Sequence, residues 1–189
     1  MSNAAEVEAA VGAALADLGP LEVLVNNAGI LDGYFNVDEM DAAVWRKVLD
    51  VDLTSVFLMS KRALREMLPR GRGRIINMAS VAGLNGTGGG AAYIAAKHGV
   101  VGLTRQMAVA YGARGITVNC VCPGPINTGM TAAIADDAKR KFARRRVPKR
   151  RYGDPEEVAQ ITLSLVLPAA SYLNGAVIPV DGGMMCQNT

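Results

Sequence analysis

Four short apolar runs alternate with longer helix-like segments along this 189-residue chain, and this alternation constrains the fold more than any other feature. Each run reads as a strand because it is brief and apolar, whereas the segments between the runs repeat their apolar residues at helical spacing. The predicted strands are residues 21–25, 74–78, 116–121 and 176–180, and the predicted helices are residues 3–18, 38–68, 90–112, 131–145 and 154–167. Because strands separated by helices pair in parallel, we expect an α/β fold with a mainly parallel sheet and flanking helices.

Local signals mark several ends of these helices. Asn3, with Glu6 three residues later, resembles a helix cap, and Gly19-Pro20 ends the same helix. The last helix opens with Asp154-Pro155, a capping side chain followed by proline at the first helical position. The long segment 38–68 is predicted to break near Asp52.

Composition and length fit one globular domain, residues 1–189. The chain is 50% hydrophobic and 20% charged, enough for a substantial core. No stretch approaches the roughly 18 unbroken apolar residues of a membrane span, and the start lacks a basic region followed by an apolar one. The cysteines number three, and Cys120 and Cys122 lie in an apolar run, so we expect buried, reduced thiols. These features predict a cytoplasmic protein with no membrane partner.

Charge is distributed unevenly. Residues 139–151 hold nine of the 20 Lys and Arg and none of the 17 Asp and Glu. A solvated helix or mobile loop is the favoured interpretation, with an anionic partner or substrate group as the alternative, which would involve Arg144, Arg145 and Arg146. A nucleic-acid arm is disfavoured because Phe142 is its one aromatic residue, so no nucleic-acid partner is expected.

Polar and glycine-containing loops follow three of the predicted strands. Ligands of open parallel sheets bind beyond the carboxyl ends of the strands, so chemistry is expected there. The loops are Asn26-Asn27-Ala28-Gly29 after the first strand, Ser80 and the Gly-rich residues 83–90 after the second, and Cys122-Pro123-Gly124-Pro125 after the third.

Tyr93 and Lys97 are four residues apart on a predicted helix, which puts both side chains on one face. A nearby ammonium favours the phenolate, so Lys97 is expected to lower the pKa of Tyr93 and bring it closer to a useful acid or base. Ser80 lies 13 residues before Tyr93, close enough for its loop to fold the hydroxyl back towards the phenol. His98, the sole histidine, points to another face of the helix and is interpreted as packing or exposed.

Together these motifs resemble the short-chain dehydrogenase/reductase family, in the style of its classical β-ketoacyl carrier-protein reductases. The resemblance runs from about residue 3 to Met185 and rests on Asn26–Gly29, the block from Ser80 to Lys97, residues 119–128 and the ending Asp181-Gly182-Gly183. It implies a Rossmann-like fold, N-terminally truncated to about four strands. It also implies hydride transfer between NAD or NADP and a small carbonyl or alcohol substrate, in a homodimer or homotetramer.

The resemblance assigns roles residue by residue. Tyr93 would exchange the proton, Lys97 would lower the pKa of the phenol and bind the nicotinamide ribose, and Ser80 would hold the reacting oxygen. The implied cofactor-binding residues are Asn26, Ala28, Gly29, Tyr93, Lys97, Pro123, Gly124, Ile126 and Thr128. For Asn26–Gly29, a structural turn that ties neighbouring strands together is an equally weighted interpretation.

Asp52 departs from the family pattern and is the fourth catalytic candidate. It stands in Val51-Asp52-Leu53, where the family has an asparagine that supports a water in the proton relay. An ionised carboxylate accepts hydrogen bonds but cannot donate them. The relay is therefore rearranged, the acid is protonated, or the site is impaired; alternatively, Asp52 bonds backbone groups at a helix kink and activity survives.

The second departure is the phosphate-binding segment. No G-x-G-x-x-G pattern precedes Asn26, although the family's fold begins with a strand, a Gly-rich turn and a helix that binds pyrophosphate. We expect a shortened version of a longer parent, with the strand at 21–25 exposing an apolar edge. The alternative to an active oxidoreductase is a catalytically silent remnant that folds or oligomerises without binding dinucleotide.

Overall fold

The structure, a computed structural model, describes residues 3–187. The strands are β1 (Val23–Asn26), β2 (Gly73–Met78), β3 (Ile116–Pro123) and β4 (Val177–Val180). The helices are α1 (Ala4–Leu18), α2 (Ala42–Leu49), α3 (Ser55–Met67), α4 (Ala91–Tyr111), α5 (Asp136–Arg146) and α6 (Pro155–Val166). All strand pairs are parallel, in the order β1-β2-β3-β4, which confirms the predicted parallel sheet with flanking helices.

Helix ends follow the predicted caps. The Asn3 side chain accepts a hydrogen bond from the backbone N–H of Ala5, and α1 ends before Gly19, whose φ is +80°. At α6, Asp154 and Glu157 form a reciprocal capping box around Pro155. The predicted helix 131–145 instead begins at Asp136, because a separate 3-10 turn capped by Thr128 occupies residues 129–131.

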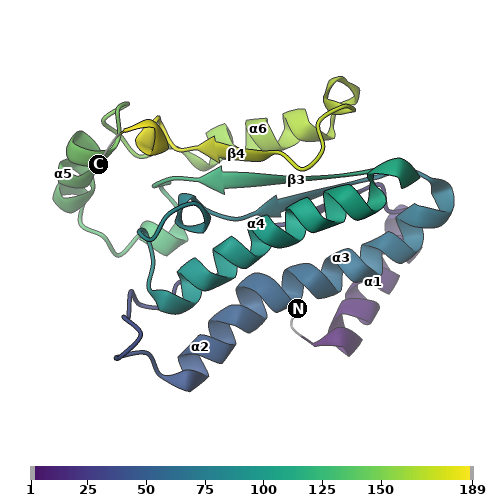
Figure 1. The fold of residues 1–189 in the computed structure, drawn as a ribbon, viewed down its shortest axis with the longest axis horizontal. Helices are drawn as coiled ribbons and strands as arrows, with labels where there is room; N and C mark the ends of the chain where they lie inside the picture. Colours follow the sequence, from purple (N-terminus) through teal and green to yellow (C-terminus); the bar gives the residue numbers. More distant parts are fainter. Residues whose placement is uncertain (1–2, 188–189) are drawn as a thin grey trace.

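The predicted break near Asp52 is a π-helical turn. Residues Asp50–Thr54 form one wide turn between α2 and α3, so the chain continues with little change of direction (Figure 1). Such turns insert one extra residue into a helix and occur often at functional sites. The turn buries Asp52 completely.

Helices cover both faces of the sheet. Figure 1 shows α2, α3 and α4 on one side of the strands and α6 on the other. Side chains alternate along each strand, so Ile75 packs in a cluster with residues of α3 and α4, whereas Ile76 packs with Leu165 of α6. Both isoleucines are fully buried, and these two layers form the core.

Strand β1 lies at one end of the sheet and keeps an exposed apolar face. Its partner is β2, and Leu24 packs in the core beneath α3. Val23 and Val25 point to the opposite face and are 37% and 41% exposed. The exposed edge expected from the sequence is therefore present in the described chain.

Cys120 and Cys122 are buried and free, as expected. No helix within residues 3–187 is both long and apolar enough to span a membrane.

Candidate active site

Tyr93 and Lys97 are both buried and lie one turn apart on the same face of α4. The tyrosine is 6% and the lysine 3% exposed, and the Lys97 Nζ lies 5.3 Å from the centre of the Tyr93 ring. The ammonium also donates a hydrogen bond of 3.3 Å to the carbonyl oxygen of Met78, the last residue of β2. The structure thus brings the predicted pair together at the carboxyl end of the sheet.

Ser80 lies beside the phenol. It caps a 3-10 turn at residues 81–83, where its Oγ accepts a hydrogen bond from Ala82 N at 3.1 Å. A hydrogen bond between Ser80 and Tyr93 acts to lower the pKa of the phenol. Ser80 is 9% exposed and lines the cavity described below, so its hydroxyl is available to a bound molecule.

The pKa of Tyr93 is nevertheless raised to about 12, which corrects the expected lowering. Burial is the largest cause, because it removes water from the phenolate, and the negative charge of Asp52 adds to it. Lys97 is not among the main causes of the shift, and a carboxylate lies beside its ammonium. The phenol therefore keeps its proton at neutral pH.

Asp52 is that carboxylate. Its Oδ2 lies 3.1 Å from Lys97 Nζ, and its Oδ1 accepts a hydrogen bond of 2.8 Å from Ile30 N in the loop after β1. The side chains are 0% and 4% exposed, so this is a buried ion pair. The bond to backbone fits the kink interpretation made from the sequence, while the ion pair to Lys97 was not expected.

Gly29 permits this close arrangement. A Cβ at this position would lie 3.1 Å from Asp52 Oδ2 and 3.2 Å from Lys97 Nζ. Such contacts are tighter than a side chain normally allows, so the absence of a side chain lets the loop pass over the ion pair.

A cavity of about 920 Å³ opens over Ser80, Tyr93 and Lys97. Of the seven predicted cofactor-binding residues other than Tyr93 and Lys97, six line it: Ala28, Gly29, Pro123, Gly124, Ile126 and Thr128. The seventh, Asn26, lies elsewhere. Gly88 of the Gly-rich loop also lines the cavity.

The Asn26 side chain points into the protein interior. Its Nδ2 donates to Ser60 Oγ at 3.1 Å and to Asn77 Oδ1 at 2.8 Å, and Asn77 in turn donates to Thr104 Oγ1. This buried chain of hydrogen bonds links β1, β2, α3 and α4. Its geometry matches the structural turn interpretation, since the amide ties neighbouring elements together.

The basic segment forms α5 and the loop that follows. Phe142 and Tyr152 line the cavity and make an edge contact with ring centroids 6.2 Å apart, and Lys139 Nζ lies 5.9 Å above the Tyr152 ring. Arg144, Arg145 and Arg146 are exposed, and the cavity lining within residues 3–187 does not include them.

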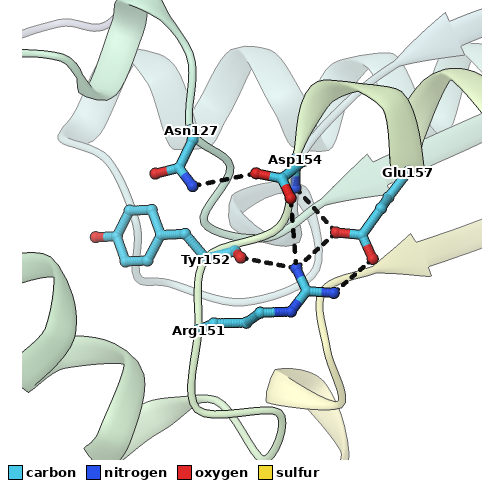
Figure 2. Close-up of polar contacts among 5 residues, drawn as sticks. All are labelled: Asn127, Arg151, Tyr152, Asp154 and Glu157. Atoms are coloured by element: carbon cyan, nitrogen blue, oxygen red, sulfur yellow. Dashed lines mark hydrogen bonds and ion pairs between the residues drawn. The ribbon is translucent and has the colours of Figure 1, made fainter.

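Arg151 is hydrogen-bonded to Glu157 at the N-terminus of α6 (Figure 2). Its two terminal nitrogens each donate to Glu157 at 2.7 Å, and Asp154 N donates to the same carboxylate at 2.9 Å. The hydrogen bond from Arg151 lowers the pKa of Glu157 to about 2. Asn127 donates to Asp154, so this cluster joins the loop after β3, which includes the lining residues Ile126 and Thr128, to α6.

Sequence reasoning missed Asp32. This residue is 2% exposed and accepts hydrogen bonds from backbone N–H groups of Gly90 and Tyr93, so it caps α4 from a distant loop. The sequence offers one indirect signal, because Gly90 precedes the helix and has no capping side chain.

The cavity is suited to the nicotinamide and ribose end of a dinucleotide. It is concave and partly apolar, and it has hydroxyl and ammonium donors at one end. Lys97 and Tyr93 would hold a ribose, and residues 123–128 would hold a carboxamide. The Gly-rich turn at residues 86–90 leads into α4, but Asp32 already accepts hydrogen bonds from Gly90 N and Tyr93 N, so that helix N-terminus does not offer these donors to a pyrophosphate. Among residues 3–187, no cluster of His, Cys, Asp or Glu forms a metal site.

Comparison with known proteins places this geometry in a family. A family model described as enoyl-(acyl carrier protein) reductase matches residues 1–185. The chain is 44% identical over 189 residues to 2-(S)-hydroxypropyl-CoM dehydrogenase 3 of Xanthobacter autotrophicus, covering 97% of this chain and 74% of that protein. It is 41% identical over 184 residues to the 3-oxoacyl-(acyl-carrier-protein) reductase FabG of Vibrio cholerae, covering 97% and 75%.

A solved structure agrees. The crystal structure of levodione reductase superposes with a TM-score of 0.94 at 38% identity, covering 99% of this chain and 75% of that one. The family match spans nearly the whole chain, and relatives above 40% identity are named as dehydrogenases and reductases. The chain therefore belongs to the short-chain dehydrogenase/reductase family of oxidoreductase enzymes, and within its classical type resembles the 3-oxoacyl-(acyl-carrier-protein) reductases.

Proposed function

We propose that this chain is an NAD(P)-dependent oxidoreductase that interconverts a carbonyl and a secondary alcohol. One observation carries the proposal: Ser80, Tyr93 and Lys97 gather, nearly buried, at the floor of a cavity large enough for a small substrate beside a nicotinamide. When bound, a nicotinamide dinucleotide supplies or accepts the hydride.

Each side chain has one role in the proton transfer. Ser80 Oγ donates a hydrogen bond to the carbonyl oxygen and orients it towards Tyr93. The Tyr93 hydroxyl gives its proton to that oxygen as the carbonyl carbon gains hydride, which leaves a phenolate beside Lys97. The Lys97 ammonium stabilises the phenolate at 5.3 Å from the ring centre.

The raised pKa of Tyr93 favours the reducing direction at neutral pH. A phenol with a pKa of about 12 is protonated there and ready to donate, whereas alcohol oxidation needs the phenolate as base. Asp52 contributes by offsetting the charge of Lys97. We therefore propose that the site catalyses carbonyl reduction at neutral pH, with oxidation increasing at high pH.

The substrate class is proposed from the wall that α5 forms. Tyr152 lines the cavity, and Lys139 Nζ lies 5.9 Å from its ring without lining the cavity itself, so from behind that ring it can attract a negatively charged group on a substrate. Relatives are named for acyl-carrier-protein and CoM substrates, so carrier-linked thioesters and anionic carbonyl compounds belong in the screen. Lys139→Ala is expected to raise KM for an anionic carbonyl substrate and to leave a neutral one unchanged, with the exposed Arg145→Ala as control. Equal effects on both substrates would reject the role of Lys139.

Assembly and location complete the proposal. We propose a homodimer or homotetramer that acts in the cytoplasm on small molecules. Light scattering of the purified chain tests the assembly.

Titration of the chain with NADH and NADPH tests the function. Nicotinamide fluorescence and thermal stability are followed together, and the titration also decides between the two cofactors. Saturable binding with a rise in melting temperature, followed by reduction of a 3-oxoacyl thioester that Tyr93→Phe abolishes, is the expected result. A folded chain that binds neither cofactor would overturn the proposal and would favour the silent remnant instead.

A further inference from the structure

The catalytic helix α4 is capped by a residue far away in the sequence. It begins after Gly90, and within the described chain no side chain of its own neighbourhood caps it. Asp32 takes that place: its Oδ1 accepts from Gly90 N and its Oδ2 accepts from Tyr93 N, both at 2.9 Å. A third N–H, that of Ala91, donates to the carbonyl oxygen of Phe35 at 3.0 Å. The N–H groups of Gly90, Ala91 and Tyr93, which a helix start leaves without an intrahelical acceptor, are thus met by one loop.

The same carboxylate shapes the loop itself. Asp32 Oδ1 also accepts from Tyr34 N at 3.1 Å, across a turn in which Gly33 and Tyr34 have φ values of +78° and +64°. A left-handed conformation is strained for tyrosine and persists where surrounding contacts impose it. The turn directs Tyr34 to the wall of the cavity, where it is 55% exposed.

Loop and helix are in direct contact. A Cβ at Gly90 would lie 2.6 Å from both the N and the O of Phe35 and 2.7 Å from Asp32 Oδ2. The backbone of the loop therefore lies against the helix N-terminus. Asp32 is only 2% exposed, so its hydrogen bonds to the helix are shielded from water. The positive end of the helix dipole favours a carboxylate at this place.

We propose that Asp32 is a positioning residue of the active site: its carboxylate clamps residues 32–35 onto the first turn of α4 and thereby fixes the Tyr93 phenol relative to the cavity wall formed by Tyr34. This inference rests on the proposed function, because it assigns to Asp32 the positioning of that function's active site. Tyr93 is the third residue of α4, so its backbone N–H is held directly by the clamp.

The clamp also acts through charge. The titratable or polar groups that face the Tyr93 phenol come from four segments: Asp32 and Tyr34 of the clamp loop, Asp52 of the π turn, Ser80 after β2, and Lys97 of α4. Asp32 is one of the groups that raise the pKa of Tyr93. Removing its charge lowers that pKa, an effect that loss of a purely structural cap would not produce.

Asp32→Asn, Asp32→Glu and the control Asp41→Asn separate these roles. Asp41 caps α2 through Ala43 N at the surface, so it is a matched helix cap outside the site. In Asp32→Asn, one former acceptor becomes an amide donor, so hydrogen exchange at Gly90 and Tyr93 is expected to accelerate. With a 3-oxoacyl thioester, kcat is expected to fall about 10-fold to 100-fold while KM changes less. The alkaline midpoint of the rate profile is expected to move down.

Asp32→Glu keeps the charge but displaces the carboxylate. It is expected to lower kcat and to leave the alkaline midpoint in place, and it carries the test if Asp32→Asn does not fold. The inference would be overturned if folded Asp32→Asn kept the wild-type kcat and the wild-type alkaline midpoint. It would also be overturned if Asp41→Asn lost as much kcat as Asp32→Asn.

A second measurement distinguishes failure of the proposed oxidoreductase function from failure of the Asp32 clamp. If wild-type protein shows no oxidoreductase activity, NMR of ring-labelled tyrosine, assigned with Tyr93→Phe, still reports the position of the phenol. A shift of the Tyr93 signal in Asp32→Asn but not in Asp41→Asn supports the clamp, and an unchanged signal overturns it.

Discussion

Replacing Asp52 by asparagine tests the electrostatics of the site most directly. The substitution removes one negative charge and keeps the shape of the side chain. Lys97 Nζ lies 5.3 Å from the Tyr93 ring centre, and at an effective dielectric constant of about 20 an unopposed ammonium there stabilises a phenolate by about 3 kcal/mol, or roughly two pKa units. Asp52 opposes this effect from beside the ammonium.

The size of that opposition follows from the ion pair. Oδ2 lies 3.1 Å from Nζ, so it is at most about 8 Å from the ring centre, and its charge destabilises the phenolate by at least about 2 kcal/mol on the same scale. Asp52→Asn should therefore lower the pKa of Tyr93 by roughly 1.5 units. Alcohol oxidation needs the phenolate, so its rate near neutral pH should rise about 30-fold and its pH midpoint should move down.

The assay is the pH dependence of kcat for oxidation of a secondary alcohol, followed by nicotinamide absorbance. Asp50→Asn is the matched control, because Asp50 belongs to the same π turn but is exposed. Stability is expected to fall in Asp52→Asn, since Lys97 loses its buried partner and an amide can accept with one oxygen only. A midpoint that stays at the wild-type value or moves up would refute the assignment of Asp52 as the charge that offsets Lys97.

Three further predictions concern stability. Because the folded-state pKa of Tyr93 is raised from 10.0 to about 12, wild-type stability should fall as pH rises between these values, and calorimetry should show a smaller fall for Tyr93→Phe. Glu157 has a folded-state pKa of about 2 against 4.5, so its stabilising contribution relative to Glu157→Gln should be present above pH 4.5 and lost as pH falls through about 2, as followed by circular dichroism. Leu165→Ala should lower the free energy of unfolding by about 2–5 kcal/mol in urea titrations, because Leu165 packs α6 against Ile76, while the half-exposed Leu163→Ala should have little effect.

The elements of the fold were predictable because their signals are local. Short apolar runs specify the strands, and caps such as Asn3 and Asp154 specify helix starts, within a few residues of the observed bounds. The start of α5 was placed too early because Thr128 caps a separate 3-10 turn, and its bonds resemble those of a helix start.

The candidate site was only partly predictable. Helical spacing alone brings Tyr93 and Lys97 together, and the loop after β2 brings Ser80 to them. The inward direction of Asn26 depends on partners 34 and 51 residues away, and sequence alone does not reveal which of two adjacent asparagines faces the interior. Asn27, not Asn26, lines the cavity.

The electrostatic balance was the least accessible feature, because it comes from separate segments that only the fold brings together. A tyrosine and a lysine one turn apart favour a lowered pKa when considered as a pair. Folding adds burial and two carboxylates, Asp52 from a π turn and Asp32 from a loop, and the direction reverses. Both carboxylates make backbone hydrogen bonds as well, Asp52 to Ile30 and Asp32 to the first turn of α4. The groups that hold the active site in place therefore also set the protonation of its acid, and a substitution at either carboxylate should change geometry and pH dependence together.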